Sequence, residues 1–174
     1  MKKHWTAFQI TKLAILLALA LMLSILEAWL LPKGILPLPG LKLGLANIAI
    51  LVTLYTVGKK EALLLAILRS LVVLVLGGNF VGFVFSMLGG VWAWCAMCLL
   101  CERKHVSIFG TSIGGAACHS IGQIMAAMLM TRTVYVLVYL PYLILASCAM
   151  GAVIAFLTIP VVRALDHLGN PVIQ

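Results

Sequence analysis

Long runs of apolar residues, separated by short segments that carry glycine, proline or charge, make up most of this 174-residue chain. An α-helix needs about 20 mainly apolar residues to cross the hydrocarbon core of a bilayer, and several of these runs reach that length. The composition agrees, because 64% of the residues are hydrophobic, 9% are charged and the mean hydropathy is +1.22. We therefore predict an all-α integral membrane protein that forms a single transmembrane domain over residues 1–174.

Six apolar runs define a compact bundle of six transmembrane helices. The predicted spans cover residues 13–31, 43–57, 62–76, 80–100, 106–130 and 134–162. No small-residue cleavage site precedes Glu27, so the first run is predicted to be a retained helix rather than a signal peptide. A proline-rich loop follows it, and Pro141 and Pro160 are candidate kinks in the sixth span.

The basic residues indicate how the bundle is oriented. Although the net charge is +8, the lysines and arginines lie singly or in pairs between apolar runs and form no contiguous basic face for nucleic acid. Six spans place both termini on one side, together with Lys2, Lys3, Lys12, Lys59, Lys60, Arg103, Lys104 and Arg163, whereas Lys33, Lys42 and Arg132 fall opposite. The positive-inside rule then predicts a plasma-membrane protein with cytoplasmic termini and an external proline-rich loop.

Arg69 lies midway along the third span and is the most informative single residue. An arginine at the bilayer centre costs about 2.5–3.5 kcal/mol even on the lenient insertion scale, so it needs a partner, a water-filled cavity or a ligand. One interpretation gives it a ligand-binding or gating role. The other is a structural pair with Glu27, the one acidic residue inside an apolar run.

The fifth span carries a polar stripe. Ser112, Gly115, His119, Gln123 and Ala126 follow each other at steps of three and four residues, so they share one helix face. His119 and Gln123 are one turn apart and offer hydrogen-bond donors and acceptors. Such a stripe either lines a binding cavity or bridges neighbouring helices.

Several motifs of catalysis are absent from the sequence. It has no GxxxxGK[ST] loop for nucleotide, no serine or cysteine nucleophile motif, and its four acidic residues are scattered rather than clustered for magnesium. Cys95, Cys98 and Cys101 are spaced like part of a metal motif but have no fourth ligand nearby, so we interpret them as small buried hydrophobic residues. We predict no enzyme activity, no catalytic residue, no metal site and no cofactor.

Three segments carry a resemblance to a known family. They are the run PGLKLGLAN at residues 39–47, Arg69 in the third span, and HSIGQ at residues 119–123. With the span pattern, these segments resemble the Gx transporter family, whose members are also named heptaprenyl diphosphate synthase component I. That family is similar to the substrate-binding S components of energy-coupling factor (ECF) transporters.

The resemblance implies a six-helix protein that captures a vitamin or similar micronutrient from outside the cell. It also implies partners, namely a transmembrane coupling protein and two cytoplasmic ATPases that supply the energy. Ala14 and Ala18, one turn apart on the first helix, would form the docking surface for the coupling protein. The loop that contains Pro32, Pro37, Pro39 and Gly40 would act as a lid over the substrate.

We therefore expect an S component that binds a small anionic or amphipathic molecule, such as a flavin, a quinone or isoprenoid precursor, or another cofactor. The expected substrate-binding residues are Lys42, Asn47, Arg69, His119 and Gln123, with the cations complementing negative charge. One alternative is a membrane accessory subunit of polyprenyl diphosphate synthesis. A second is a standalone secondary transporter driven by an ion gradient.

Overall fold

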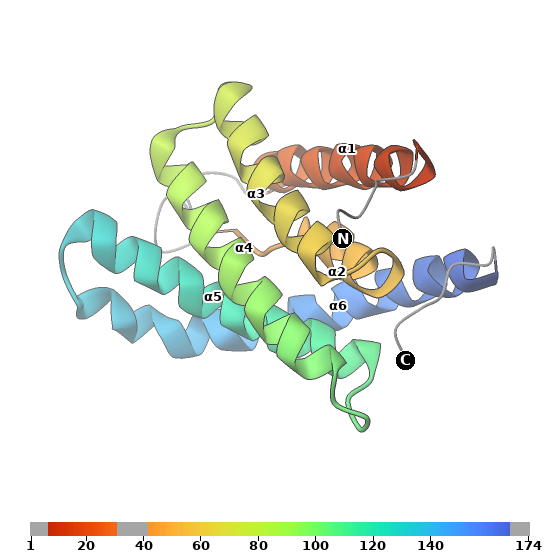
Figure 1. The fold of residues 1–174 in the computed structure, drawn as a ribbon. Coiled ribbons are helices and arrows are strands. Elements are labelled where there is room, and N and C mark those ends of the chain that lie inside the picture. The colour runs from red at the N-terminus through yellow and green to blue at the C-terminus, as the bar shows by residue number, and fades with distance from the viewer. Residues whose placement is uncertain (1–6, 31–41, 168–174) are drawn as a thin grey trace.

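The computed structural model describes residues 7–30 and 42–167, and within these ranges the secondary structure is helical (Figure 1). The elements are α1 (Ala7–Leu30), α2 (Asn47–Thr56), α3 (Lys59–Val75), α4 (Phe80–Cys101), α5 (Ile108–Thr131), the short 3₁₀ helix η1 (Tyr135–Tyr139) and α6 (Leu140–His167). The predicted all-α bundle is confirmed. The proline-rich loop that the sequence predicted to be a lid lies outside the described residues.

Four segments are long and apolar enough to cross a membrane. They are Ala7–Trp29, Phe80–Cys101, Ile108–Thr131 and Tyr135–Leu165. The two remaining helices are shorter, since α2 has 10 residues and α3 has 17. At 1.5 Å per residue they measure about 15 and 25 Å, less than the roughly 30 Å hydrocarbon core.

The short helix α2 forms the centre of the bundle. All ten of its residues are buried, and it packs against α1, α3, α4 and α6. Its length is the main departure from the predicted span 43–57, because residues 43–46 form an irregular segment and a turn instead of a helix. Gly44 adopts a φ of 86°, a left-handed conformation that ends any helix extending backwards from α2.

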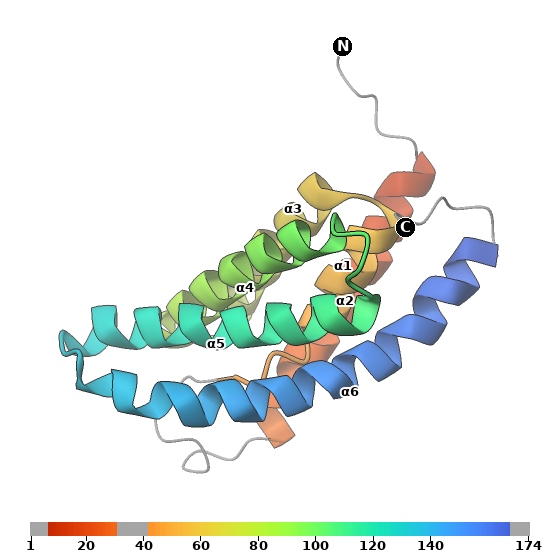
Figure 2. The same ribbon diagram turned by 90° about the horizontal axis from the view of Figure 1, so that it is seen from below.

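Helix α5 packs against both α4 and α6, and Figure 2 shows α5 and α6 running next to each other. The Ser112 hydroxyl donates to the carbonyl oxygen of Gly151 at 2.7 Å, and the hydroxyls of Ser120 and Ser147 share a hydrogen bond. Small polar residues at such contacts allow helices to approach closely in lipid.

The structure locates the prolines and cysteines that the sequence analysis singled out. Pro141 stands in the first turn of α6, after η1, where its missing N–H costs no helical hydrogen bond, whereas Pro160 lies inside the helix. Of the three cysteines predicted to be buried, only Cys101 is, while Cys98 is half-buried and Cys95 is exposed. The prediction for Cys95 is wrong because α4 turns that face away from the other helices.

Helix α1 lies at the edge of the bundle, against α2 and α3 (Figure 1). Much of its apolar surface is uncovered, as Trp29 illustrates with 83% exposure. The N-terminal half is tied to α2 by Lys12, whose ammonium donates to the carbonyl oxygen of Thr56 at 3.2 Å. This exposure indicates that α1 faces mostly lipid, because apolar side chains are favourable in lipid and unfavourable in water.

Candidate functional site

The predicted site residues meet in one buried polar cluster, although they come from four different parts of the chain. Asn47 and Gln123 are fully buried, Arg69 and His119 are each 2% exposed, and Lys42 is half-buried. Lys42 lies in the segment before α2, Asn47 begins α2, Arg69 belongs to α3, and the other two share α5. The expected grouping in space is therefore present, whereas its role in binding stays a prediction.

Gln123 connects the segment before α2 to His119. The backbone N–H of Lys42 donates to Gln123 Oε1 at 3.3 Å, and Gln123 Nε2 lies 2.9 Å from His119 Nε2. Since a backbone N–H can only donate, it assigns the oxygen end of the amide to Lys42 and the NH₂ end to His119. His119 Nε2 must then accept, so the ring is neutral and carries its proton on Nδ1.

Two glycines leave the space that the His119 ring occupies. A Cβ at Gly44 would stand 2.8 Å from Asn47 Nδ2 and 3.3 Å from His119 Cδ2. A Cβ at Gly89 of α4 would stand 2.7 Å from His119 Cε1. The imidazole is thus packed between the segment before α2 and the backbone of α4, which fixes its orientation.

Glu27 also belongs to this cluster. Its carboxylate accepts a hydrogen bond from the backbone N–H of Gly44 at 2.6 Å and also interacts with the N–H of Leu43, and its side chain is 2% exposed. The sequence interpretation treated Glu27 only as a possible partner of Arg69. Its position as the one acidic residue in an apolar run is the signal that could have placed it in the site.

Arg69 is held by α4 rather than by Glu27. Its Nη2 donates to the Ser86 hydroxyl at 3.1 Å and to the Ser86 carbonyl oxygen at 3.4 Å, and Ser70 donates to the same hydroxyl at 3.3 Å. Among the described residues no ion pair joins Arg69 to Glu27, although their charges are near enough to interact. The sequence reasoning missed Ser70 and Ser86, which were visible only as small polar residues inside apolar runs.

Several polar atoms of the cluster have no hydrogen-bond partner. They are both amide atoms of Asn47 and Nε of Arg69, whereas Nδ1 of the neutral His119 ring faces the backbone of Gly89. Buried polar groups in proteins are nearly always paired, so unused capacity of this kind is typical of a site that a ligand or water completes. Burial lowers the pKa of the Lys42 ammonium, the charge of Arg69 lowers it further, and the charge of Glu27 opposes both effects.

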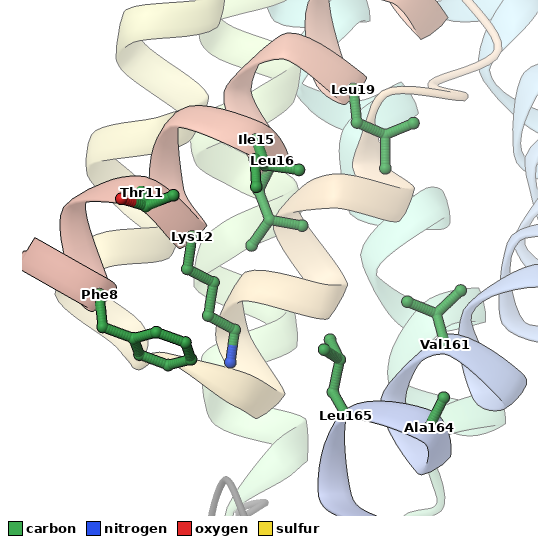
Figure 3. Close-up of a pocket in the computed structure, with 9 residues that line it drawn as sticks. All are labelled: Phe8, Thr11, Lys12, Ile15, Leu16, Leu19, Val161, Ala164 and Leu165. Atoms are coloured by element: carbon green, nitrogen blue, oxygen red, sulfur yellow. The ribbon is translucent and has the colours of Figure 1, made fainter. Parts of the chain in front are cut away.

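The predicted docking residues, Ala14 and Ala18, are both exposed on α1. Ala14 borders a hollow of about 210 Å³ between α1 and α3. A larger apolar groove of about 720 Å³ lies between α1 and the C-terminal part of α6, with Lys12 at its edge (Figure 3). Neither hollow includes a residue of the buried polar cluster. The hollows beside α1 are therefore separate from the candidate binding site.

Comparison with known proteins identifies the fold and the family. The fold is similar to a solved structure described as the S component of a bacterial ECF transporter, with a TM-score of 0.70, 20% sequence identity, and coverage of 91% of this chain and 95% of that one. No curated protein sequence gives a match. Residues 16–160 match the sequence pattern of the family described as heptaprenyl diphosphate synthase component I. The chain therefore belongs to the heptaprenyl diphosphate synthase component I family and has the fold of an ECF transporter S component.

Proposed function

We propose that the protein is the membrane-embedded, substrate-binding S component of an ECF-type importer and that it captures a small anionic or amphipathic molecule from outside the cell. The observation that carries the proposal is the buried cluster of Asn47, Arg69 and His119, which retains unpartnered hydrogen-bonding atoms inside an S-component fold. Leaving such atoms unpaired costs stability, about 1–3 kcal/mol for each buried group. A ligand that pairs with them recovers that cost.

Each residue of the cluster has a proposed role. Arg69 and Lys42 supply positive charge, and the two hydrogen bonds from Arg69 to Ser86 aim the guanidinium while leaving Nε free. Asn47 offers a donor and an acceptor at the start of α2. Gln123 positions His119 and the backbone of Lys42, so it supports the site through its neighbours.

We propose that ATP-derived energy for import comes from other proteins, because the sequence contains no nucleotide-binding loop. The proposed partners are a transmembrane coupling protein and two cytoplasmic ATPases. The exposed face of α1 at Ala14 and Ala18 is the proposed contact with the coupling protein. Small side chains on an exposed helix suit this role, since they let a second helix approach closely in lipid.

The family description favours a second candidate, a membrane accessory subunit of polyprenyl diphosphate synthesis. Such a subunit would anchor or deliver substrate to a soluble synthase. Against a direct catalytic role, the four acidic residues of the sequence lie far apart along the chain, whereas diphosphate–magnesium chemistry uses clustered carboxylates. The partner that co-purifies with the protein distinguishes the two candidates.

Native mass spectrometry of gently purified protein tests the binding function. We expect the wild type to retain a small molecule, Arg69→Ala to lose it, and Lys60→Ala to keep it, because Lys60 is an exposed lysine outside the cluster. If the wild type carries no bound molecule, or if Arg69→Ala retains the same one at the same occupancy, the proposal is contradicted.

A further inference from the structure

The charges of the buried cluster do not balance. Among the described residues it contains two basic side chains, Lys42 and Arg69, and one acidic side chain, Glu27. His119 adds no charge, because its Nε2 accepts a hydrogen bond from Gln123 and the ring is therefore neutral. With Lys42 protonated and Glu27 ionised, the cluster carries one positive charge in excess.

The unpartnered atoms of the cluster are mainly hydrogen-bond donors. Nε of Arg69 and Nδ2 of Asn47 are donors, and Oδ1 of Asn47 is an acceptor. The side chains of the cluster lie close to three glycines. Asn47 and His119 flank Gly44, His119 also lies against Gly89, and Arg69 Nη2 lies beside Gly90. A ligand group that pairs with the unpartnered atoms would meet donors and an excess positive charge.

The carboxylate of Glu27 forms no hydrogen bond with Arg69. It is hydrogen-bonded to the backbone of Gly44 and Leu43, while Arg69 is hydrogen-bonded to Ser86. When ionised, Glu27 therefore offsets one unit of charge without a hydrogen bond to Arg69, and Nε of Arg69 stays unpartnered. The charge of Glu27 therefore reduces the negative charge that a ligand must carry to neutralise the cluster.

From this balance we propose that the site selects a ligand group with a single negative charge, such as a carboxylate or a phosphodiester, over a phosphate monoester or a diphosphate. One negative charge neutralises the cluster, whereas each further charge would be buried without a counter-ion, which is strongly unfavourable in a low-dielectric interior. The inference rests on the proposed substrate-binding function. It names the class of substrate, and it disfavours the prenyl diphosphate that the family description suggests.

The test uses three probes with the same alkyl chain and measures their binding to the detergent-solubilised full chain at pH 8. Hexanoate carries one negative charge, hexyl phosphate carries close to two, and hexanol carries none. Three variants change the charge of the cluster or leave it alone. Glu27→Gln raises the excess charge by one, Lys42→Gln removes it, and Lys60→Gln is the control at an exposed position.

We expect the wild type to bind hexanoate more tightly than hexyl phosphate and hexanol. In Glu27→Gln the ratio of the two anion dissociation constants should shift by at least about tenfold toward hexyl phosphate, and Lys42→Gln should weaken hexanoate binding by at least about tenfold. Lys60→Gln should match the wild type. If Glu27→Gln does not fold, the Lys42→Gln comparison decides alone.

In this test, four results overturn the inference. The first is an unchanged anion ratio in a folded Glu27→Gln variant, and the second is hexanoate binding that Lys42→Gln leaves intact. The third is wild-type protein that binds hexyl phosphate or hexanol as tightly as hexanoate, and the fourth is wild-type protein that binds no probe. Failure of the proposed function looks different, because the purified protein would then retain no molecule of its own. A retained molecule that is neutral or multiply charged would overturn only the charge selection.

Discussion

Nε2 of Gln123 lies 2.9 Å from Nε2 of His119, one helical turn earlier on α5, while Oε1 of the same amide accepts the backbone N–H of Lys42. One side chain thus fixes both the tautomer of a buried histidine and the position of the segment that precedes α2. Glu27 holds that segment from the other side through Gly44. The site is therefore assembled around residues 42–44, which lie in neither of the adjoining helices.

Gln123→Leu should weaken both binding and folding. The change keeps the approximate volume of the side chain but leaves the N–H of Lys42 and Nε2 of His119 without partners. Each unpaired buried group costs about 1–3 kcal/mol, so we expect the free energy of unfolding to fall by about 2–6 kcal/mol. Met125→Leu, on the same helix, should cost less than about 1.5 kcal/mol and serves as the control. Equal stability of the two variants would show that the amide bridge is unimportant.

Gly89→Ala should disturb His119, whereas Gly90→Ala should not. A Cβ at position 89 meets the imidazole at 2.7 Å, but one at position 90 first meets Arg69 Nη2 at 3.4 Å, an ordinary contact. Overpacking costs about 1–3 kcal/mol, and Gly→Ala inside a helix otherwise gains about 0.5–1 kcal/mol. Thermal unfolding in detergent measures the difference. A Gly89→Ala variant as stable as Gly90→Ala would mean that the ring moves freely.

The orientation of the bundle is a prediction from the loop charges. We expect Lys33→Cys to react with a membrane-impermeant thiol reagent on intact cells and Lys60→Cys to react only after lysis, because the positive-inside rule places the second residue in the cytoplasm. Both variants are compared with the wild type, which has five cysteines of its own. The reverse pattern of labelling would place the termini outside.

Bulky side chains at Ala14 and Ala18 should block assembly but spare the site. Both alanines are exposed on α1, away from the buried cluster, so a double change to tryptophan fills the proposed contact surface and little of the interior. We expect loss of complex formation, with binding by the isolated subunit retained to within about tenfold, or roughly 1.4 kcal/mol. Ala152→Trp on α6 is a control for added bulk elsewhere. An intact complex in the double variant would remove this face from the proposal.

Much of the fold was predictable because long apolar runs have few alternatives in a membrane. The helices α4 and α5 begin and end within two residues of the predicted bounds. The start of α2 was not, because residues 43–46 continue the apolar run, and their irregular conformation depends on distant contacts with Glu27 and Gln123. Hydropathy records none of these contacts.

The polar cluster was predictable in part for a related reason. A charged or amide side chain in an apolar run has to be accommodated, so Arg69, His119 and Gln123 were visible in the sequence. The serines that hold Arg69 were not, because serine is common at helix contacts and carries no signal of its own. Which polar residues meet is decided by helix packing, which a single sequence does not record.

Affinity purification of the protein from its own membranes in mild detergent, followed by identification of the bound chains, tests the central claim most directly. The account predicts a complex with a transmembrane coupling protein and two ATPases, which the Ala14→Trp, Ala18→Trp double variant fails to form. Recovery of a soluble prenyl diphosphate synthase subunit, with no ATPase, would contradict it.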